Sequence, residues 1–237
     1  MTDNPASLLQ AALLRDPAGP LITYYDDATG ERTELSAKTL ANWVAKTANL
    51  FSSELDLAPE DRVAVLLPAH WQTAVVLLAL WSLGARPGPD LETGDIVVAA
   101  EPRLAGLTAE GSHDVVGLSL APMNQPLQDA PPGVLDYAAE VLSAGDSFTA
   151  SRPSGQLETM AAQAWAQETG LSGADRVLVG GELGAENALD WLVTPLVAQA
   201  SIVLCRNADR SKLLRRVADE RVTVTLGVTV VGTRRLD

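Results

Sequence analysis

Apolar residues recur along this chain in two patterns that alternate from one end to the other. Short apolar runs without polar interruption predict strands that are covered on both faces, as in a parallel sheet. They occupy residues 62–67, 95–100, 115–120, 176–179, 201–205 and 222–226. Because helical patterns separate most of these runs, the sequence predicts parallel strands joined by crossover helices.

Apolar residues at helical spacing mark the helices. The predicted helices cover residues 6–15, 36–51, 71–83, 134–142, 156–169, 185–198 and 209–220. Ser36 has the side chain of a good N-cap, and Gly84 and Gly170 stand where helices commonly end in a left-handed residue. Pro195 is expected to interrupt the helix that contains it.

The first two strands depart from this crossover pattern. Residues 21–25 and 31–35 flank five residues rich in Asp and Gly, which predicts an antiparallel hairpin. Two segments rich in Pro and Gly, 86–94 and 121–133, are interpreted as surface connectors rather than domain linkers. We therefore predict a single α/β domain over residues 1–237, with a doubly wound, mostly parallel sheet flanked by helices.

The charge balance narrows the range of partners. The chain has 17 basic and 30 acidic residues and a net charge of −13. So acidic a surface repels phosphate backbones, and nucleic acid is not an expected partner. The N-terminus lacks the basic start and apolar core of a signal peptide, and the longest apolar stretch, 73–83, is too short to span a bilayer. We expect a cytoplasmic protein with no membrane partner.

The residues that commonly carry chemistry are few and scattered. Cys205 is the single cysteine and lies in a predicted strand, so we interpret it as a buried thiol in a reducing compartment. The two histidines, His70 and His113, lie in contexts too different to predict a metal site. A hydrolase triad would be supported by a G-x-S-x-G turn, which the sequence lacks. The five tryptophans lie in predicted helices and are expected to pack against the sheet.

One polar stretch near the middle of the chain has the composition of an anion-binding loop. Residues 147–155 are rich in Ser, Thr and Gly and precede a predicted helix. Backbone N–H groups and the helix dipole would point at a phosphate bound there. The stretch has Phe148 near its start and no lysine, and both features weaken it as a phosphate site.

Three stretches match one set of known motifs in order and approximate spacing. DRVAVLLP at 61–68 and LLALWSLGA at 77–85 are similar to a GDRVAVLLPN strand and an LLAxLKAGA helix. GLSGADRVL at 170–178 and the segment 194–204 resemble GLTPDDRVL…PLLAGATVVL, and DERVTVTLGV at 219–228 resembles EERVTVLFGVP. These motifs belong to the N-terminal region of the adenylate-forming superfamily of acyl-CoA synthetases, nonribosomal peptide adenylation domains and luciferases. The chain resembles that region over nearly its whole length, and more narrowly a short subfamily of actinobacterial type.

The stretch 147–155 falls in register with this family's phosphate loop, S-G-T-T-G-x-P-K-G. The residues that the resemblance assigns to a vestigial nucleotide site are Ser147, Thr149, Ser151, Arg152 and Gly155. Phe148 stands at the first glycine and Ser154 at the lysine. A side chain forced into the glycine conformation costs roughly 1–3 kcal/mol, and the missing lysine removes a contact worth about 1.5–3 kcal/mol. We therefore interpret the stretch as a degenerate phosphate loop.

Two further departures weaken the enzymatic interpretation. Where the family has a P-x-x-H segment, this chain has residues 180–187, in which Glu182 and Glu186 would repel an anion. A helix-capping loop is therefore preferred there over a ligand site. The family's YGxTE and TGD segments and its C-terminal domain with the catalytic lysine lie beyond the last residue of this sequence. The resemblance thus implies no catalytic residue, no metal site and no resident cofactor, with ATP or AMP as the alternative ligand.

Two functional hypotheses follow. The first is a catalytically incompetent remnant of an acyl-CoA synthetase-like protein that acts as a binding or interaction module. A homodimer or a protein partner would then cover an exposed sheet edge or helix face. The second is a half-ligase, completed by another polypeptide, that retains nucleotide or acyl/CoA binding. The degenerate loop favours the first, whereas ATP binding that is lost on substitution of Thr149 and Ser151 would support the second.

Overall fold

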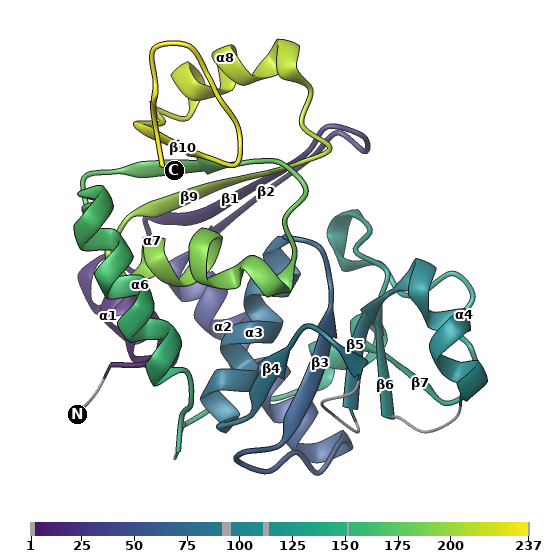
Figure 1. Ribbon diagram of the computed structural model, residues 1–237. Helices are drawn as coiled ribbons and strands as arrows, with labels where there is room; N and C mark the ends of the chain where they lie inside the picture. Colours follow the sequence, from purple (N-terminus) through teal and green to yellow (C-terminus); the bar gives the residue numbers. More distant parts are fainter. Residues whose placement is uncertain (1–2, 92–95, 111–113, 151, 237) are drawn as a thin grey trace.

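The computed structural model describes residues 3–91, 96–110, 114–150 and 152–236 of the 237-residue chain. Its strands form two sheets, and helices α2 and α3 lie between them (Figure 1). The predicted α/β class, with mostly parallel strands flanked by helices, is confirmed. The strands divide between two sheets, however, and do not continue in one.

The smaller sheet has five parallel strands in the order β4-β3-β5-β6-β7. The strands are β3 (Arg62–Leu66), β4 (Arg86–Gly88), β5 (Ile96–Ala100), β6 (Asp114–Leu118) and β7 (Val134–Asp136). Val97 and Val98 are fully buried, Val97 in the core beneath α4 and Val98 in the main core. Because successive residues of a strand point to opposite faces, both faces of this sheet are covered, which explains the apolar runs without alternation.

The larger sheet has six strands in the order β11-β10-β8-β9-β1-β2. The strands are β1 (Pro20–Asp26), β2 (Glu31–Ser36), β8 (Arg176–Val179), β9 (Ser201–Arg206), β10 (Val224–Leu226) and β11 (Arg234–Arg235). The predicted hairpin is confirmed, since β1 and β2 pair antiparallel. On its other side β1 pairs parallel with β9, with Ile22 opposite Ile202. The N-terminal hairpin therefore extends a sheet built from the second half of the chain.

The helices pack on these sheets largely as their patterns predict. They are α1 (Pro5–Arg15), α2 (Ala37–Glu54), α3 (Trp71–Leu83), α4 (Glu101–Glu110), α5 (Tyr137–Glu140), α6 (Gln156–Thr169), α7 (Thr194–Val197) and α8 (Arg210–Asp219). Ser36 caps α2 by accepting a hydrogen bond from the Thr39 amide, and Gly84 ends α3 with φ +87°. Every residue from Trp71 to Ser82 is buried, because α3 packs between the two sheets.

Five segments differ from the sequence prediction. The expected helix at 134–142 begins as strand β7, and only Tyr137–Glu140 is α-helical. Helix α4 and the short strands β4 and β11 were not predicted. The helix expected at 185–198 is divided: a π-helical turn at Leu189–Val193 precedes α7. Pro195 has no amide hydrogen to donate to the backbone hydrogen bonds of this helix, which accounts for the break.

Among the residues described above, none of the helices combines enough length with enough apolar character to cross a membrane.

Candidate functional site

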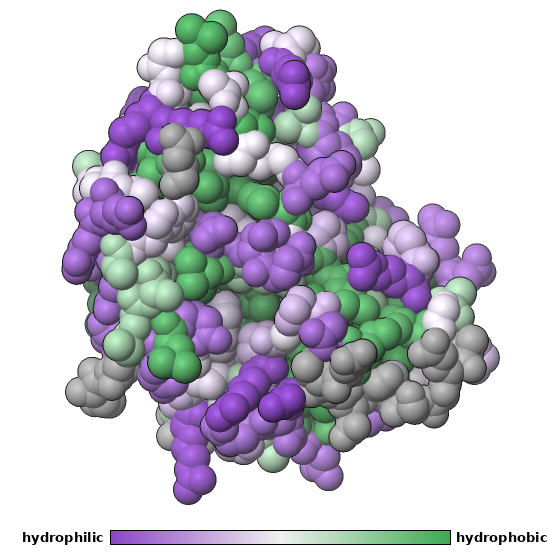
Figure 2. Space-filling view, in the orientation of Figure 1, coloured by the Kyte–Doolittle hydropathy of each residue, from purple (hydrophilic) through white to green (hydrophobic). Residues whose placement is uncertain are grey.

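A cavity of about 1390 Å³ opens where the carboxyl ends of strands from both sheets face each other. Strands β3 and β5 contribute from the smaller sheet, and β8, β9 and β10 from the larger one. Ligands of open parallel sheets commonly bind at such carboxyl ends. Apolar side chains gather below α8 and are surrounded by hydrophilic ones (Figure 2). The position and size of the cavity make it the candidate binding site.

A glycine-rich wall forms the side of the cavity next to β8. Gly181 and Gly227 have φ +95° and +72°, and a Cβ on Gly227 would collide with the carbonyl oxygen of Gly180. Glycine is therefore required for these two strand ends to approach each other. Gly184 accepts a hydrogen bond from Trp191 Nε1 at 2.9 Å and donates to Asn187 Oδ1 at 3.2 Å. The segment 180–187 thus caps the following helical turn, as predicted, and also lines the cavity.

Backbone hydrogen bonds join the two sheets at the edge of the cavity. Pro68, just after β3, and Gly184, after β8, form an antiparallel bridge. The Ala69 amide donates to the Leu183 carbonyl at 2.7 Å, and the Ala185 amide donates to the Leu67 carbonyl at 2.9 Å. This rim therefore has a fixed backbone geometry.

Charged side chains of both signs line the cavity. Arg103, Arg206 and Arg210 line it together with Glu182 and Glu186, which gives the lining a net charge of +1 in a chain whose net charge is −13. Within the described part of the chain, none of these five side chains forms an ion pair. Unpaired arginines beside apolar surface suit a ligand that carries both an anionic and an apolar group.

His70 and Tyr24 lie fully buried behind the cavity wall. Their ring centroids are 4.3 Å apart in an edge-to-face arrangement. His70 caps α3, and its Nδ1 accepts a hydrogen bond from the Gln72 amide at 3.1 Å. Burial lowers the pKa of His70 to about 3 and raises that of Tyr24 above its usual range. Both groups are therefore neutral at physiological pH, and His70 Nε2 has no hydrogen-bond partner among the described residues.

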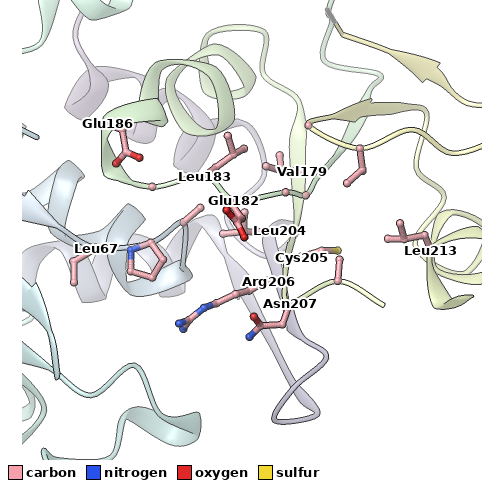
Figure 3. A pocket seen from close by; sticks show the side chains of 18 of the residues that line it. Leu67, Val179, Glu182, Leu183, Glu186, Leu204, Cys205, Arg206, Asn207 and Leu213 are labelled. Atoms are coloured by element: carbon pink, nitrogen blue, oxygen red, sulfur yellow. The ribbon is translucent and has the colours of Figure 1, made fainter. Parts of the chain in front are cut away.

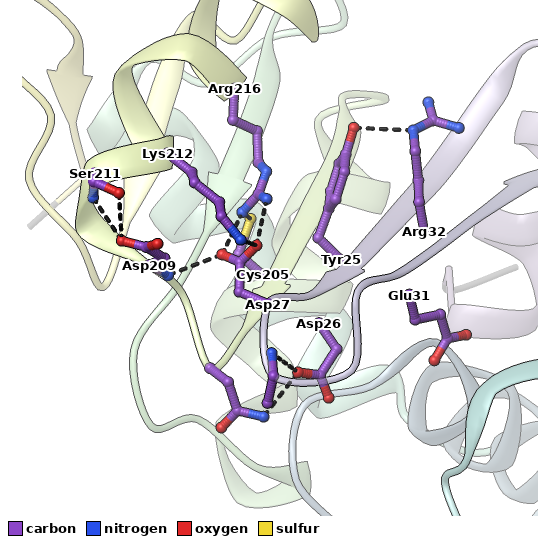
Figure 4. Close-up of polar contacts among 12 residues, drawn as sticks. Tyr25, Asp26, Asp27, Glu31, Arg32, Cys205, Asp209, Ser211, Lys212 and Arg216 are labelled. Carbon is purple, nitrogen blue, oxygen red and sulfur yellow. Dashed lines mark hydrogen bonds and ion pairs between the residues drawn. The ribbon is translucent and has the colours of Figure 1, made fainter.

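Helix α8, which contributes Arg210, Leu213 and Leu214 to the cavity, is held against the first hairpin by a buried ion pair. Arg216 on α8 contacts Asp27 in the hairpin turn at 2.8 Å (Figure 4). The hydrogen bond from Arg216 lowers the pKa of Asp27 to about 2. The position of α8, and with it one wall of the cavity, therefore depends on the contact between Arg216 and Asp27.

A second ionic cluster supports the same hairpin. Glu220 accepts hydrogen bonds from Tyr25 at 2.5 Å and Arg176 at 2.7 Å, and Arg32 lies 3.1 Å away. Burial alone would raise the pKa of Glu220, but these donors lower it to about 2. The cluster contributes to the position of the sheet rather than to the cavity lining.

Cys205 is buried, as predicted, and has no disulfide partner. Burial raises the pKa of its thiol to about 11. The thiol is therefore protonated at neutral pH, which does not suit a nucleophile. His113 lies outside the described residues, and among those described no cluster of side chains could hold a metal ion.

The predicted phosphate stretch, 147–155, lies away from the cavity. The Ser154 amide donates to the Trp81 carbonyl at 2.9 Å, and Ser154 Oγ donates to the Ala85 carbonyl at 2.6 Å. Both acceptors lie at the C-terminal end of α3, whose Gly84 carbonyl also accepts from Glu60 just before β3. The stretch therefore packs near the amino end of β3, whereas the cavity lies at its carboxyl end.

The individual residues of the predicted nucleotide site have different environments. Ser147, Thr149 and Arg152 are exposed, Gly155 is buried, and Ser151 lies outside the described residues. The carbonyl of Ser147 accepts a hydrogen bond from Asn49 Nδ2 at 3.0 Å. Gly155, with φ +88°, packs against Pro5 and Trp81. These contacts attach the stretch to α1, α2 and α3, and its assignment to nucleotide binding stays a prediction.

The arginines of the cavity and the contact of Tyr24 with His70 were not predicted from the sequence. The signal that could have indicated the cavity was position along the chain. Arg206 and Gly180 each directly follow an apolar run that is predicted to be a parallel strand. The carboxyl ends of such strands share one edge of a sheet, where sites commonly form.

Comparison with known proteins places the chain in a group of related sequences. It is 44% identical to a TIGR03089 family protein of Mycobacterium tuberculosis (strain ATCC 25618 / H37Rv), over 95% of this chain and 98% of the relative. No family profile matches the sequence.

Solved structures with the same fold are CoA ligases and synthetases. An anthranilate CoA ligase in complex with anthranoyl-AMP is 14% identical, with a TM-score of 0.75 over 95% of this chain and 49% of that one. A Brucella canis acyl-CoA synthetase is 15% identical, with a TM-score of 0.74 over 94% and 47%. An acetoacetyl-CoA synthetase of Streptomyces lividans is 18% identical, with a TM-score of 0.74 over 94% and 42%.

The chain spans about half the length of these solved structures. The resemblance to the adenylate-forming superfamily is confirmed at the level of the fold, which these structures share with nearly the whole of this chain. By its identity to the mycobacterial relative and by this fold, the chain belongs to the TIGR03089 family and has the fold of a region of acyl-CoA synthetases.

Proposed function

We propose that this protein is a catalytically incompetent, acyl-CoA synthetase-like binding module that holds a small molecule in the cavity between its two sheets. The observation that carries this proposal is the separation of two features. The cavity lies at the carboxyl ends of the strands, whereas the stretch in register with the family's phosphate loop packs against the C-terminal end of α3.

The composition of that stretch supports the non-catalytic function. Phe148 and Ser154 replace a glycine and the lysine of the family loop, and the Ser154 hydroxyl is already bonded to the Ala85 carbonyl. Arg152 is the single cation of the nine residues, with Asp146 and Glu158 nearby in sequence. Few groups are thus left there to bind a triphosphate.

Calorimetry with ATP, AMP, CoA and an acyl-adenylate analogue tests this function. We expect no nucleotide affinity that depends on the loop. Micromolar binding of ATP that disappears on substitution of Thr149 and Ser151 would contradict the proposal.

A variant with a side chain that fills the cavity tests whether the cavity is the binding site. Val228→Trp, at a half-buried lining position, is expected to abolish binding of any small molecule that the wild-type protein retains. Leu14→Trp, on α1 at a residue that is 85% exposed, serves as the control. Equal loss of binding in both variants would show that the cavity is not the site.

A second candidate function is a half-ligase that another polypeptide completes. The observation that favours it is an exposed apolar pair on α6, Leu157 and Met160, which are 79% and 54% exposed. The polypeptide that completes a half-ligase would cover such a surface, as a homodimer or a protein partner would cover it in the binding module. Size-exclusion chromatography with light scattering at micromolar concentration tests the homodimer, and a monomer unchanged by Leu157→Ser would count against it.

We also propose a cytoplasmic location and an actinobacterial origin. Support for the first is the single, buried and unbridged Cys205, which fits a reducing compartment. Support for the second is the mycobacterial relative. Fractionation of the native host would test the location.

A further inference from the structure

We infer that the outward face of helix α6 is a self-complementary surface on which a second copy of this chain packs, with the two α6 helices antiparallel about a two-fold axis. The inference rests on the proposed function, because it identifies the partner of the binding module. The two surfaces are separate. The described residues that line the cavity belong to other segments, such as Arg206 on β9 and Glu182 and Glu186 after β8 (Figure 3).

Helix α6 carries apolar residues on its outward face as well as on its inward one. The inward face contains the buried residues Thr159, Ala162 and Ala166. The outward face contains four exposed apolar residues at positions i, i+3, i+4 and i+7, which we name the α6 stripe: Leu157, Met160, Ala161 and Ala164. This spacing places the four on one side of a helix. The helix lies at the left edge of the molecule in Figure 1, and Figure 2 shows hydrophobic side chains over it.

The order of large and small residues makes the α6 stripe complementary to a second, antiparallel copy of itself. With the two-fold axis between Met160 and Ala161, Leu157 lies level with the partner's Ala164, because both are equally far from the centre. A large side chain therefore meets a small one on each side of the axis. Met160 and Ala161 lie beside their own counterparts at the axis itself. Large residues that face small ones allow two helices to pack closely.

Charge favours the antiparallel arrangement over the parallel one. Arg152 precedes α6 and Glu168 lies in its last turn, and both are exposed. Within the described structure neither forms an ion pair. An antiparallel pair brings Arg152 near the partner's Glu168 at both ends of the contact. A parallel pair would instead place the two copies of Glu168 together, which is unfavourable.

The N-terminus of α6 gives the same preference. Gly155, the residue before the helix, makes no side-chain hydrogen bond to the first amides. A carboxylate is favourable at the positive end of a helix, and the partner's Glu168 would supply one there. Arg152 and Gly155 belong to the stretch 147–155, so this stretch would take part in an interface between copies.

The predicted dimer is weak and reversible. One pair of helices of 14 residues, each about 21 Å long, makes a small interface, and the net charge of −13 on each chain opposes association. We therefore expect a dissociation constant of about 1–100 μM.

Sedimentation equilibrium of the full chain, at concentrations from about 1 to 200 μM, tests the dimer. Leu157→Ser should weaken association about tenfold or more, because each dimer buries two copies of this side chain. Leu14→Ser is the matched control, since Leu14 is an equally apolar residue that is 85% exposed on α1, and it should associate as the wild type does. A wild-type monomer at every concentration would leave the α6 stripe to a different polypeptide and overturn the inference. Equal effects of the two variants would overturn it as well.

A charge exchange tests the orientation of the helices. Arg152→Glu and Glu168→Arg should each weaken the dimer several-fold, and the double variant should recover most of the wild-type affinity. Failure of the double variant to recover would overturn the antiparallel arrangement. Unchanged unfolding temperatures of the single variants would show that these effects arise at the interface and not in the fold.

The dimer and the proposed function fail separately. Small-molecule binding that Val228→Trp abolishes, in a chain that stays monomeric, would overturn this inference and leave the proposed function intact. A dimer that Leu157→Ser disrupts, in a chain whose cavity binds no small molecule, would support this inference and remove the proposed function.

Discussion

Arg216 Nη2 lies 2.8 Å from Asp27 Oδ1, and both side chains are 8% exposed. The guanidinium also stacks over the Tyr25 ring, with 4.0 Å between its central carbon and the ring centroid. A complete ion pair is thus buried between α8 and the turn of the first hairpin. Because α8 forms one wall of the cavity, this pair connects the stability of the fold to the shape of the site.

Removing one partner of this pair should be strongly destabilising. In Asp27→Asn the buried Arg216 charge loses its counter-ion, and we expect the free energy of unfolding to fall by about 3 kcal/mol. Asp219→Asn is the matched control, since the Arg215–Asp219 pair on the same helix is exposed, and it should lose less than about 0.5 kcal/mol. Urea denaturation measures both values, and similar losses would contradict the structure.

The same pair gives the protein a defined sensitivity to acid. The pKa of Asp27 is lowered from 3.8 to about 2 in the folded protein. A carboxyl group whose pKa is lowered by folding stabilises the fold at pH values above its pKa in the unfolded chain. That contribution disappears as the pH falls through its pKa in the folded protein. We expect Asp27 to contribute about 2 kcal/mol that is lost between about pH 5 and pH 2.

Stability measured in urea at several pH values between these limits tests that contribution. The stability of Asp27→Asn should change less with pH than that of the wild type, by the amount that Asp27 contributes. Glu220→Gln should likewise reduce the dependence of stability on pH, because the pKa of Glu220 is lowered from 4.5 to about 2. Parallel profiles for wild type and Asp27→Asn would show that the pair is not formed.

The thiol of Cys205 should be inert in the folded protein. Its pKa of about 11 and its burial leave little accessible thiolate. Reaction with a chromogenic disulfide reagent at about pH 8 should be at least about 100-fold slower than in the denatured chain. Cys205→Ser supplies the background rate. Rapid reaction of the native protein would place the thiol at an accessible surface.

Substitution of two glycines distinguishes the stability cost of backbone strain from the cost of disturbing the packing of the stretch 147–155. Gly84 and Gly30 have φ +87° and +78°, but a Cβ on Gly84 would collide with the Arg152 carbonyl, whereas one on Gly30 would have open space within the described structure. Gly30→Ala should cost about 1 kcal/mol. Gly84→Ala should cost about 1–3 kcal/mol more. Equal thermal stability of the two variants would mean that the stretch is not packed against α3.

Local patterns predicted most of the elements because each depends on neighbouring residues. The unbroken apolar run at β3, the Ser36 cap and the left-handed Gly84 all appear where expected. Helix α4 was missed because it contains Pro102 and Gly106 and lacks a strong apolar stripe.

The division into two sheets could not be predicted from such patterns. It depends on pairings between distant segments, such as Ile22 with Ile202. The candidate site depends on the same pairings. Arg206 meets Tyr24 only because β1 lies beside β9, and His70 reaches Tyr24 from the other sheet. Residue type alone indicated neither relationship.

The backbone bridge between Pro68 and Gly184 has a kinetic consequence. Two sheets joined at the rim of a cavity cannot separate there without breaking the hydrogen bonds of Ala69 and Ala185. The cavity is then complete before a molecule arrives, and no slow opening of this rim precedes binding. In rapid-mixing experiments the observed association rate should rise in proportion to ligand concentration without reaching a plateau.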